Sequence, residues 1–212
     1  MLHGLIFDVD GTLGDTVPLC YEAFRRALLP FKGRLYSDAE IQATFGRTEE
    51  GISQLLEPQR WREVFESYVS HYRALHSRYA RPFPEMVPLL EWLQARGLRL
   101  AVVTGKGPVT ARITLEDFGL ARFFTLVETG SPDGPNKPLG MMSIVWAWGV
   151  PPSEVAYVGD TPYDMRACRE AGVIALGAAW VSTAQAEALR AEGPAAVFTT
   201  VEGLRAWAEE KG

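Results

Sequence analysis

The chain has 212 residues, of which 47% are hydrophobic and 22% are charged, and its formal net charge is −5. This length allows one large domain or a core with a smaller satellite, and the hydrophobic content can bury a sizeable core. The negative charge argues against nucleic acid or an anionic membrane surface as the main partner. No apolar run approaches the roughly 18 residues of a membrane span, and two cysteines are too few for a disulfide framework, so we expect a cytoplasmic protein.

The first predicted element is a short buried strand at residues 5–7, and two aspartates follow it directly. Asp8 and Asp10 stand in the stretch Phe7-Asp-Val-Asp-Gly-Thr-Leu13. In a fully extended chain both carboxylates would share one face. Gly11 lets the backbone turn tightly at this point, so Asp10 can point in another direction.

Residues 15–80 show no convincing strand pattern and are predicted to be helical almost throughout. One amphipathic stripe marks a long helix whose aromatic residues we expect to pack in a core; its members are Trp61, Val64, Phe65, Tyr68, Tyr72, Leu75 and Tyr79. The prolines of residues 81–84 end this helix. We therefore expect a helical cap domain at 15–81, inserted after the first strand of a core that comprises 1–14 and 82–212.

From about residue 85 onward, short apolar runs alternate with helix-length segments. The runs that predict strands are 98–103, 124–128, 155–158 and 173–176. The segments that predict helices are 86–96, 109–118, 139–148 and 165–171. This alternation predicts an α/β fold, namely a doubly wound, Rossmann-like parallel sheet with helices on both faces. In such sheets ligands bind outside the carboxyl ends of the strands.

Polar side chains follow the predicted strands at this edge of the sheet. Beyond the first strand, they are Thr104, Lys137, Asp160 and Asp164. Each alone would be an ordinary turn, helix cap or surface lysine, but together they indicate a site. Crowded carboxylates repel one another unless a cation joins them, and an all-oxygen site suits Mg²⁺. Lys137, Thr104 and free backbone N–H groups would suit a phosphoryl group beside that ion.

These motifs resemble those of the haloacid dehalogenase superfamily. The stretch Phe7–Leu13 is similar to the superfamily's nucleophile signature, and Thr104, Lys137 and Gly159-Asp-Thr-Pro-Tyr-Asp164 match its later motifs in order. The predicted helical insertion stands where the family has its C1 cap. The stretch Asp164–Gly172 further resembles the phosphoglycolate phosphatase branch. The resemblance covers the whole chain.

The resemblance implies a role for each acidic residue. Asp8 would be the nucleophile that becomes an aspartyl phosphate. Asp10 would protonate the leaving alcohol and then activate water. Mg²⁺ would be held by the Asp8 carboxylate, the Asp10 main-chain carbonyl and Asp160. Asp164 would orient metal-bound water or Lys137.

The resemblance also implies which residues hold the substrate. Thr104, Lys137 and the Gly105 N–H would bind the phosphoryl oxygens, although the family often has asparagine at the position of Gly105. Gly11 is predicted to lie at the same substrate-binding surface. Arg47 lies in the turn 45–48 between predicted helices. It would contact an anionic group on the leaving half of the substrate, that is, the part released as the alcohol, or it would be a solvated surface residue.

The predicted function is hydrolysis of a small phosphate monoester, similar to 2-phosphoglycolate, by a Mg²⁺-dependent phosphatase that acts as a monomer or homodimer. Alternatives are a pyrophosphatase and a sugar-phosphate mutase of the β-phosphoglucomutase type. Dehalogenases of the family lack the acid that Asp10 supplies, so phosphotransfer is favoured over dehalogenation. A receiver-type signalling module is a remote alternative, because it would need neither Asp10 nor the helical insertion.

Overall fold

A six-stranded parallel sheet forms the centre of the molecule. The computed structural model describes residues 1–211, and the strand order in the sheet is β5-β4-β1-β6-β7-β8. Its strands are β1 (Gly4–Phe7), β4 (Arg99–Val103), β5 (Leu126–Glu128), β6 (Val155–Gly159), β7 (Ile174–Ala178) and β8 (Ala196–Phe198). Every neighbouring pair is parallel, with helices in the connections. The predicted α/β fold class is confirmed.

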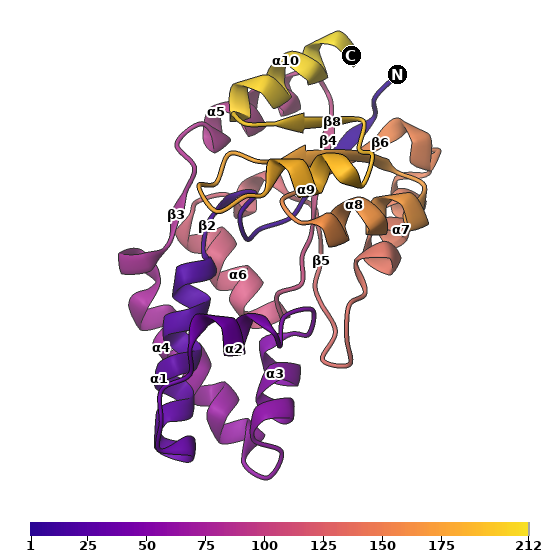
Figure 1. The fold of residues 1–212 in the computed structure, drawn as a ribbon. Helices are drawn as coiled ribbons and strands as arrows, with labels where there is room; N and C mark the ends of the chain where they lie inside the picture. Colours follow the sequence, from indigo (N-terminus) through magenta and orange to yellow (C-terminus); the bar gives the residue numbers. More distant parts are fainter. Residues whose placement is uncertain (212) are drawn as a thin grey trace.

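The described part of the chain contains ten α-helices. They are α1 (Val17–Lys32), α2 (Asp38–Gln42), α3 (Glu49–Leu56), α4 (Trp61–Tyr79), α5 (Met86–Ala95), α6 (Pro108–Asp117), α7 (Lys137–Trp148), α8 (Pro162–Ala171), α9 (Ala186–Ala191) and α10 (Val201–Lys211). Helices α1 to α4 gather on one side of the molecule, beyond one edge of the sheet (Figure 1). None of the helices in residues 1–211 is long and apolar enough to cross a membrane.

Both faces of the sheet are buried, which explains why its strands are continuous apolar runs. Successive side chains of a strand point to opposite faces. Leu5 and Phe7 of β1 thus pack in a cluster that includes buried residues of α5, α6 and α10, while Ile6 packs in a second cluster with α7 and α8. The first cluster continues into α1 and α4.

The helices inserted after β1 pack on one another through aromatic side chains. The buried residues of α4 are Val64, Tyr68, Tyr72, Leu75 and His76, and the rings of Phe24 and Tyr68 lie 4.1 Å apart between centroids. Two short strands, β2 (Gly14–Asp15) and β3 (Arg81–Pro82), pair antiparallel where the chain leaves the sheet and returns to it. The boundaries expected for a cap domain fall at this pair; the cap as an independent domain stays a prediction.

Candidate active site

The polar side chains predicted at the strand ends meet at one edge of the sheet. Strand β1 lies between β4 and β6, so Asp8 follows the central strand while Thr104 and Asp160 follow its two neighbours. The Asp8 backbone N–H donates to the Val158 carbonyl at 3.0 Å, which continues the ladder by one residue. Asp8 is almost fully buried, with 4% of its surface exposed. Its carboxylate is therefore fixed at the floor of the site.

The chain turns sharply after Asp8. The Val9 carbonyl accepts the backbone N–H groups of Thr12, Leu13 and Gly14, and Gly11 adopts a φ of +71° that favours glycine. A Cβ at Gly11 would also collide with the Asp160 carboxylate. Glycine is required here both for the turn and for the close approach of Asp160.

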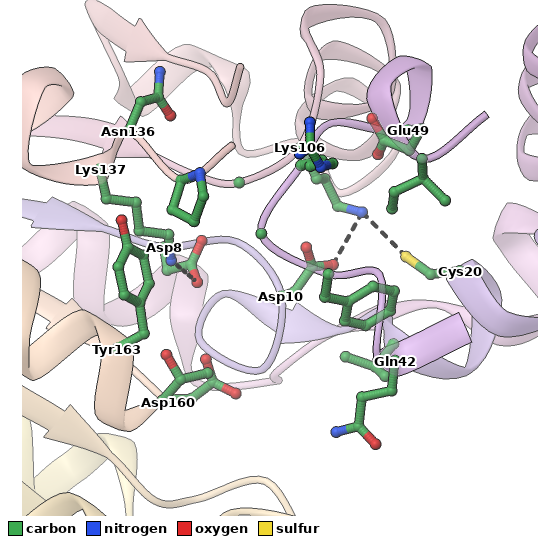
Figure 2. A pocket seen from close by; sticks show the side chains of 18 of the residues that line it. Asp8, Asp10, Cys20, Gln42, Glu49, Lys106, Asn136, Lys137, Asp160 and Tyr163 are labelled. Carbon is green, nitrogen blue, oxygen red and sulfur yellow. Dashed lines mark hydrogen bonds and ion pairs between the residues drawn. The ribbon is translucent and has the colours of Figure 1, made fainter. Parts of the chain in front are cut away.

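Lys137 joins two of the aspartates. Its ammonium Nζ donates to Asp8 Oδ2 at 2.7 Å and to Asp164 Oδ1 at 2.6 Å. Burial alone would lower the pKa of Lys137, but the charges of Asp164 and Asp8 outweigh it and the pKa is raised. Lys137 is therefore a cation. Figure 2 shows it beside Asp8, at the first residue of α7.

Asp164 is held on both oxygens. Oδ1 accepts from Lys137 and from the Tyr157 hydroxyl at 3.1 Å. Oδ2 accepts from the Thr161 N–H at 3.0 Å and the Thr161 hydroxyl at 2.6 Å, in the capping box that begins α8. The local sequence Thr-Pro-Tyr-Asp thus both starts the helix and orients a carboxylate toward Lys137.

Three carboxylates converge here. One oxygen each from Asp8, Asp160 and Asp164 lies within 4.8 Å of the others. Burial raises the pKa of Asp8 to about 6, despite the opposing charge of Lys137. Burial, with Asp164 and Asp8 next, also raises the pKa of Asp160. Ionisation of all three carboxylates would place more negative charge here than Lys137 balances, and their oxygen donors fit a hard divalent cation.

Asp10 points away from this cluster. Its Oδ1 accepts from the Thr16 hydroxyl and forms an ion pair with the Lys106 ammonium at 3.0 Å. The Asp10 side chain is 27% exposed, whereas that of Lys106 is 2% exposed. Figure 2 shows Lys106 on the opposite side of Asp10 from Asp8 and Lys137. The turn at Gly11 thus gives the two aspartates different surroundings, as the sequence predicted.

A cavity of about 440 Å³ lies between the sheet edge and the inserted helices. The core side contributes most of the charged groups, including Asp8, Lys137 and Asp160. The inserted segment contributes an apolar wall of Val17, Cys20, Phe24, Ile52 and Tyr68. It also contributes the polar side chains of Gln42, Arg47 and Glu49. A small ligand would thus contact charges at one end and hydrocarbon at the other.

The predicted phosphoryl-binding residues occupy different places. Gly105 lines the cavity, and a Cβ there would meet nothing within 4 Å, so packing does not demand the glycine. Thr104 is buried, and its hydroxyl accepts the Lys106 N–H at 3.3 Å. Neither Thr104 nor Gly11 is among the described residues that line the cavity. The Gly11 N–H donates to the Gly14 carbonyl at 2.9 Å.

Arg47 lines the cavity but is exposed. Its guanidinium donates to the Pro132 carbonyl at 2.9 Å, and the Thr48 N–H donates to the Ser131 carbonyl at 3.0 Å. The segment before α3 is therefore held against the loop between β5 and α7, which reaches toward it in Figure 1. The contact to Pro132 gives Arg47 a structural role beside the predicted one.

The sequence reasoning missed two buried charged residues. Lys106 stands in the Thr104-Gly-Lys-Gly107 stretch, but nothing in that stretch shows which way its side chain turns. Glu49 begins α3, where an acidic residue is expected for its favourable interaction with the helix dipole. In the structure its carboxylate accepts the Gly107 N–H at 2.7 Å and the Thr110 hydroxyl at 2.5 Å.

The chain is an α/β protein with a Rossmann-like core and an aspartate-rich site at the carboxyl ends of its strands. A family model described as haloacid dehalogenase-like hydrolase matches residues 5–178, and the chain belongs to this family. The match includes the inserted helices. A receiver-type module would not need these helices, so the match favours the hydrolase family over that alternative. Within the family the predicted enzyme class, a phosphatase, is confirmed by the relatives described next.

The chain is similar to curated proteins over most of its length. It is 30% identical to a phosphoglycolate phosphatase of Neisseria meningitidis over 190 residues, which cover 83% of this chain and 80% of that protein. It is 26% identical to a pyrophosphatase PpaX of Anoxybacillus flavithermus, with 84% of each chain covered. Among solved structures, a haloacid dehalogenase-like hydrolase of Streptococcus pneumoniae has a TM-score of 0.79 at 25% identity, covering 97% of this chain and 98% of that one.

Proposed function

We propose that the protein is a Mg²⁺-dependent phosphatase that hydrolyses a small phosphate monoester similar to 2-phosphoglycolate, through an aspartyl phosphate on Asp8. The observation that carries this proposal is the position of the Asp8 carboxylate. It lies buried at the floor of the cavity, 2.7 Å from the Lys137 ammonium and in a cluster with two further aspartates. A nucleophile, a fixed positive charge and a set of metal-ligand oxygens are thus together.

Mg²⁺ would be held by the Asp8 carboxylate, the Asp10 main-chain carbonyl and Asp160. Both oxygens of Asp164 already accept hydrogen bonds from Lys137 and Thr161, which supports a role in orienting its neighbours. The bound ion would neutralise the crowded carboxylates and polarise the phosphoryl group.

Asp8 would attack phosphorus while the bond to the leaving oxygen breaks. Asp10 would give its proton to that oxygen, so the alcohol leaves neutral. In the second half, Asp10 would take a proton from water as the water oxygen attacks the phosphorus of the aspartyl phosphate. The bond between phosphorus and the Asp8 oxygen then breaks, which releases phosphate and restores Asp8. Lys137, Thr104 and the Gly105 N–H would hold the phosphoryl oxygens.

The cavity volume and the relatives support the substrate class. About 440 Å³ must hold a phosphoryl group as well as the leaving half, so the leaving half is small. Relatives named phosphoglycolate phosphatase and pyrophosphatase favour 2-phosphoglycolate first and pyrophosphate second. A sugar-phosphate mutase would in addition have to shield its aspartyl phosphate from water. The predictions of a cytoplasmic monomer or homodimer stay predictions.

The test is a panel of phosphate compounds assayed with Mg²⁺. It should include 2-phosphoglycolate, pyrophosphate, β-glucose 1-phosphate and p-nitrophenyl phosphate, with release of inorganic phosphate as the readout. We expect the highest kcat/KM for 2-phosphoglycolate. Isomerisation of the sugar phosphate that depends on a sugar bisphosphate, without phosphate release, would identify a mutase instead. Absence of phosphate release from every compound would contradict the proposal.

Removal of divalent metal should stop turnover. Excess chelator leaves the carboxylate cluster without its cation, and added Mg²⁺ should restore the rate. Ca²⁺ should restore it poorly, because it prefers more ligands and can take both oxygens of a carboxylate. The measurement is phosphate release after chelation and after each metal is returned. Full activity in excess chelator would refute the metal site.

Stabilisation by Mg²⁺ should increase as pH rises through about 6, because burial raises the pKa of Asp8 from 3.8 to about 6. In the metal-free protein the folded state then holds this proton more tightly than the unfolded state. The contribution of Asp8 to the free energy of unfolding therefore falls as pH rises from 3.8 to about 6, by on the order of 1–3 kcal/mol. Mg²⁺ binds the ionised carboxylate and reverses the loss.

The measurement is the Tm with and without Mg²⁺ on either side of pH 6. We expect the difference between the two Tm values to be larger on the alkaline side. An Asp8→Asn variant serves as control, because it lacks this titrating group and should lose the part of the pH dependence that Asp8 contributes. An equal Mg²⁺ effect on both sides of pH 6 in the wild type would count against ionised Asp8 as a ligand.

A further inference from the structure

Lys106 carries a buried positive charge that the proposed reaction does not use. Its ammonium Nζ lies 3.0 Å from Asp10 Oδ1 and 3.4 Å from Cys20 Sγ, and 4.8 Å from the centroid of the Tyr72 ring. Burial would lower the pKa of Lys106, but the charge of Asp10, with smaller effects of its other neighbours, raises it. Burial raises the pKa of Cys20 to about 12, so that side chain is a neutral thiol. Asp10 is therefore the carboxylate that balances Lys106 directly.

The two buried lysines of the cavity differ in their partners. Lys137 contacts two carboxylates, those of Asp8 and Asp164. Lys106 contacts one, that of Asp10. Glu49 is also near Lys106, but its two oxygens accept from Gly107 and Thr110. Figure 2 shows Lys106 on the side of Asp10 that faces the inserted helices.

This is the side of the cavity that the leaving half of a substrate would occupy. With phosphorus at Asp8, the leaving oxygen must face Asp10 in order to take its proton. The atoms beyond that oxygen then lie between the Lys106 ammonium and the apolar wall of Phe24, Ile52 and Tyr68. A buried cation discriminates strongly between a charged and a neutral ligand group. The ammonium of Lys106 has already lost its water shell in the folded protein, so binding of the ligand requires no further desolvation of this group.

Lys106 lines the cavity and has fewer anionic partners than Lys137. One carboxylate, that of Asp10, lies within contact distance of its ammonium, whereas Lys137 contacts two. An anionic group on the substrate would therefore form a second ion pair with Lys106. Arg47 is less suited to this role, because it is exposed and contacts Pro132.

We propose that Lys106 is the specificity-determining residue of the cavity, and that it binds a carboxylate or phosphate on the leaving half of a small phosphate ester. The substrate anion would join Asp10 as a partner of the ammonium. This inference rests on the proposed phosphatase function. It assigns the discrimination between anionic and neutral substrates to a residue of the core rather than to the inserted helices.

The test compares two esters of the same length, 2-phosphoglycolate and the neutral-ended 2-hydroxyethyl phosphate. The kcat/KM ratio of the two should be measured with Mg²⁺ in the wild type, Lys106→Met and Lys106→Arg. We expect Lys106→Met to lower the ratio about ten- to hundredfold, as for loss of a charge-assisted contact. Lys106→Arg keeps the charge and should recover part of it. Lys211→Met, at the end of α10, is a matched control and should keep the wild-type ratio.

A second measurement separates this inference from the proposed function. Binding of 2-phosphoglycolate and of pyrophosphate to Asp8→Asn and to Asp8→Asn/Lys106→Met can be followed by calorimetry without turnover. Weaker binding of either anion to the double variant supports the inference. The anion whose affinity falls more shows whether Lys106 favours a carboxylate or a phosphate. Equal binding in both variants, or equal loss of kcat/KM for both esters, would overturn it and leave Lys106 only as a positioning residue for Asp10. Lack of hydrolysis of both esters by the wild type would instead contradict the proposed function, while the binding result still decides the role of Lys106.

Discussion

Asp8→Asn should abolish phosphatase turnover while the fold is kept. An amide cannot form the acyl phosphate, so the reaction loses its covalent route. The fold should tolerate the change, because the raised pKa of Asp8 means that its ionised form is unfavourable in the buried, metal-free site. Lys137 retains its contact with Asp164 at 2.6 Å. Metal affinity should fall, since one proposed ligand loses its charge.

Two measurements check this result. Steady-state phosphate release should drop below detection in the variant, with a Tm close to that of the wild type in chelator. Mass spectrometry of the wild type, quenched in acid during turnover, should show a protein species heavier by one phosphoryl group, and the variant should lack it. Wild-type rates from the purified variant would end the proposal of a nucleophilic Asp8.

Asp10→Asn should lower turnover by roughly two to four decades, the usual contribution of a general acid–base group. The nucleophile and the main-chain metal contact remain, so activity should not vanish. The amide oxygen can still accept from Thr16 and Lys106, which keeps the side chain near its place. The loss should be smaller for p-nitrophenyl phosphate, because its leaving group needs little protonation.

The comparison of leaving groups is the control for Asp10. Rates for 2-phosphoglycolate and p-nitrophenyl phosphate should be measured under single-turnover conditions in wild type and variant. If both substrates lose the same factor, Asp10 acts on something other than the leaving oxygen. Burst kinetics would then show whether breakdown of the aspartyl phosphate is the slowed step.

Much of the fold could be predicted because both faces of the sheet are buried. Buried parallel strands are continuous apolar runs, and β4 and β6 were predicted within a residue of their observed ends. The strand predicted at 124–128 begins only at Leu126, where its pairing with β4 starts, and a 3₁₀ turn at Ala121–Phe123 precedes it. The strands β2 and β3 have two residues each, which is too short for a pattern of alternating apolar and polar residues to predict them.

The part of the site that could be predicted is the set of polar residues that follow the strand ends in the sequence. Asp8, Lys137 and Asp160 meet because parallel strands end at the same edge. The direction of a long side chain, by contrast, depends on contacts far along the chain. Lys106 turns toward Cys20, which is 86 positions away, and no local pattern encodes that contact.

Glu49 has a consequence for how the molecule holds together. Helix α6 begins at Pro108, and its N-cap residue is Gly107, which has no side chain that could cap the helix. The Glu49 carboxylate accepts the N–H of this N-cap residue, and it comes from α3, 58 positions earlier in the chain. The start of a core helix is thus completed by a residue from the inserted segment. We therefore expect the order of the α6 N-terminus to depend on the position of α3, so that displacement of α3 would also disturb the loop with Gly105 and Lys106, which line the cavity.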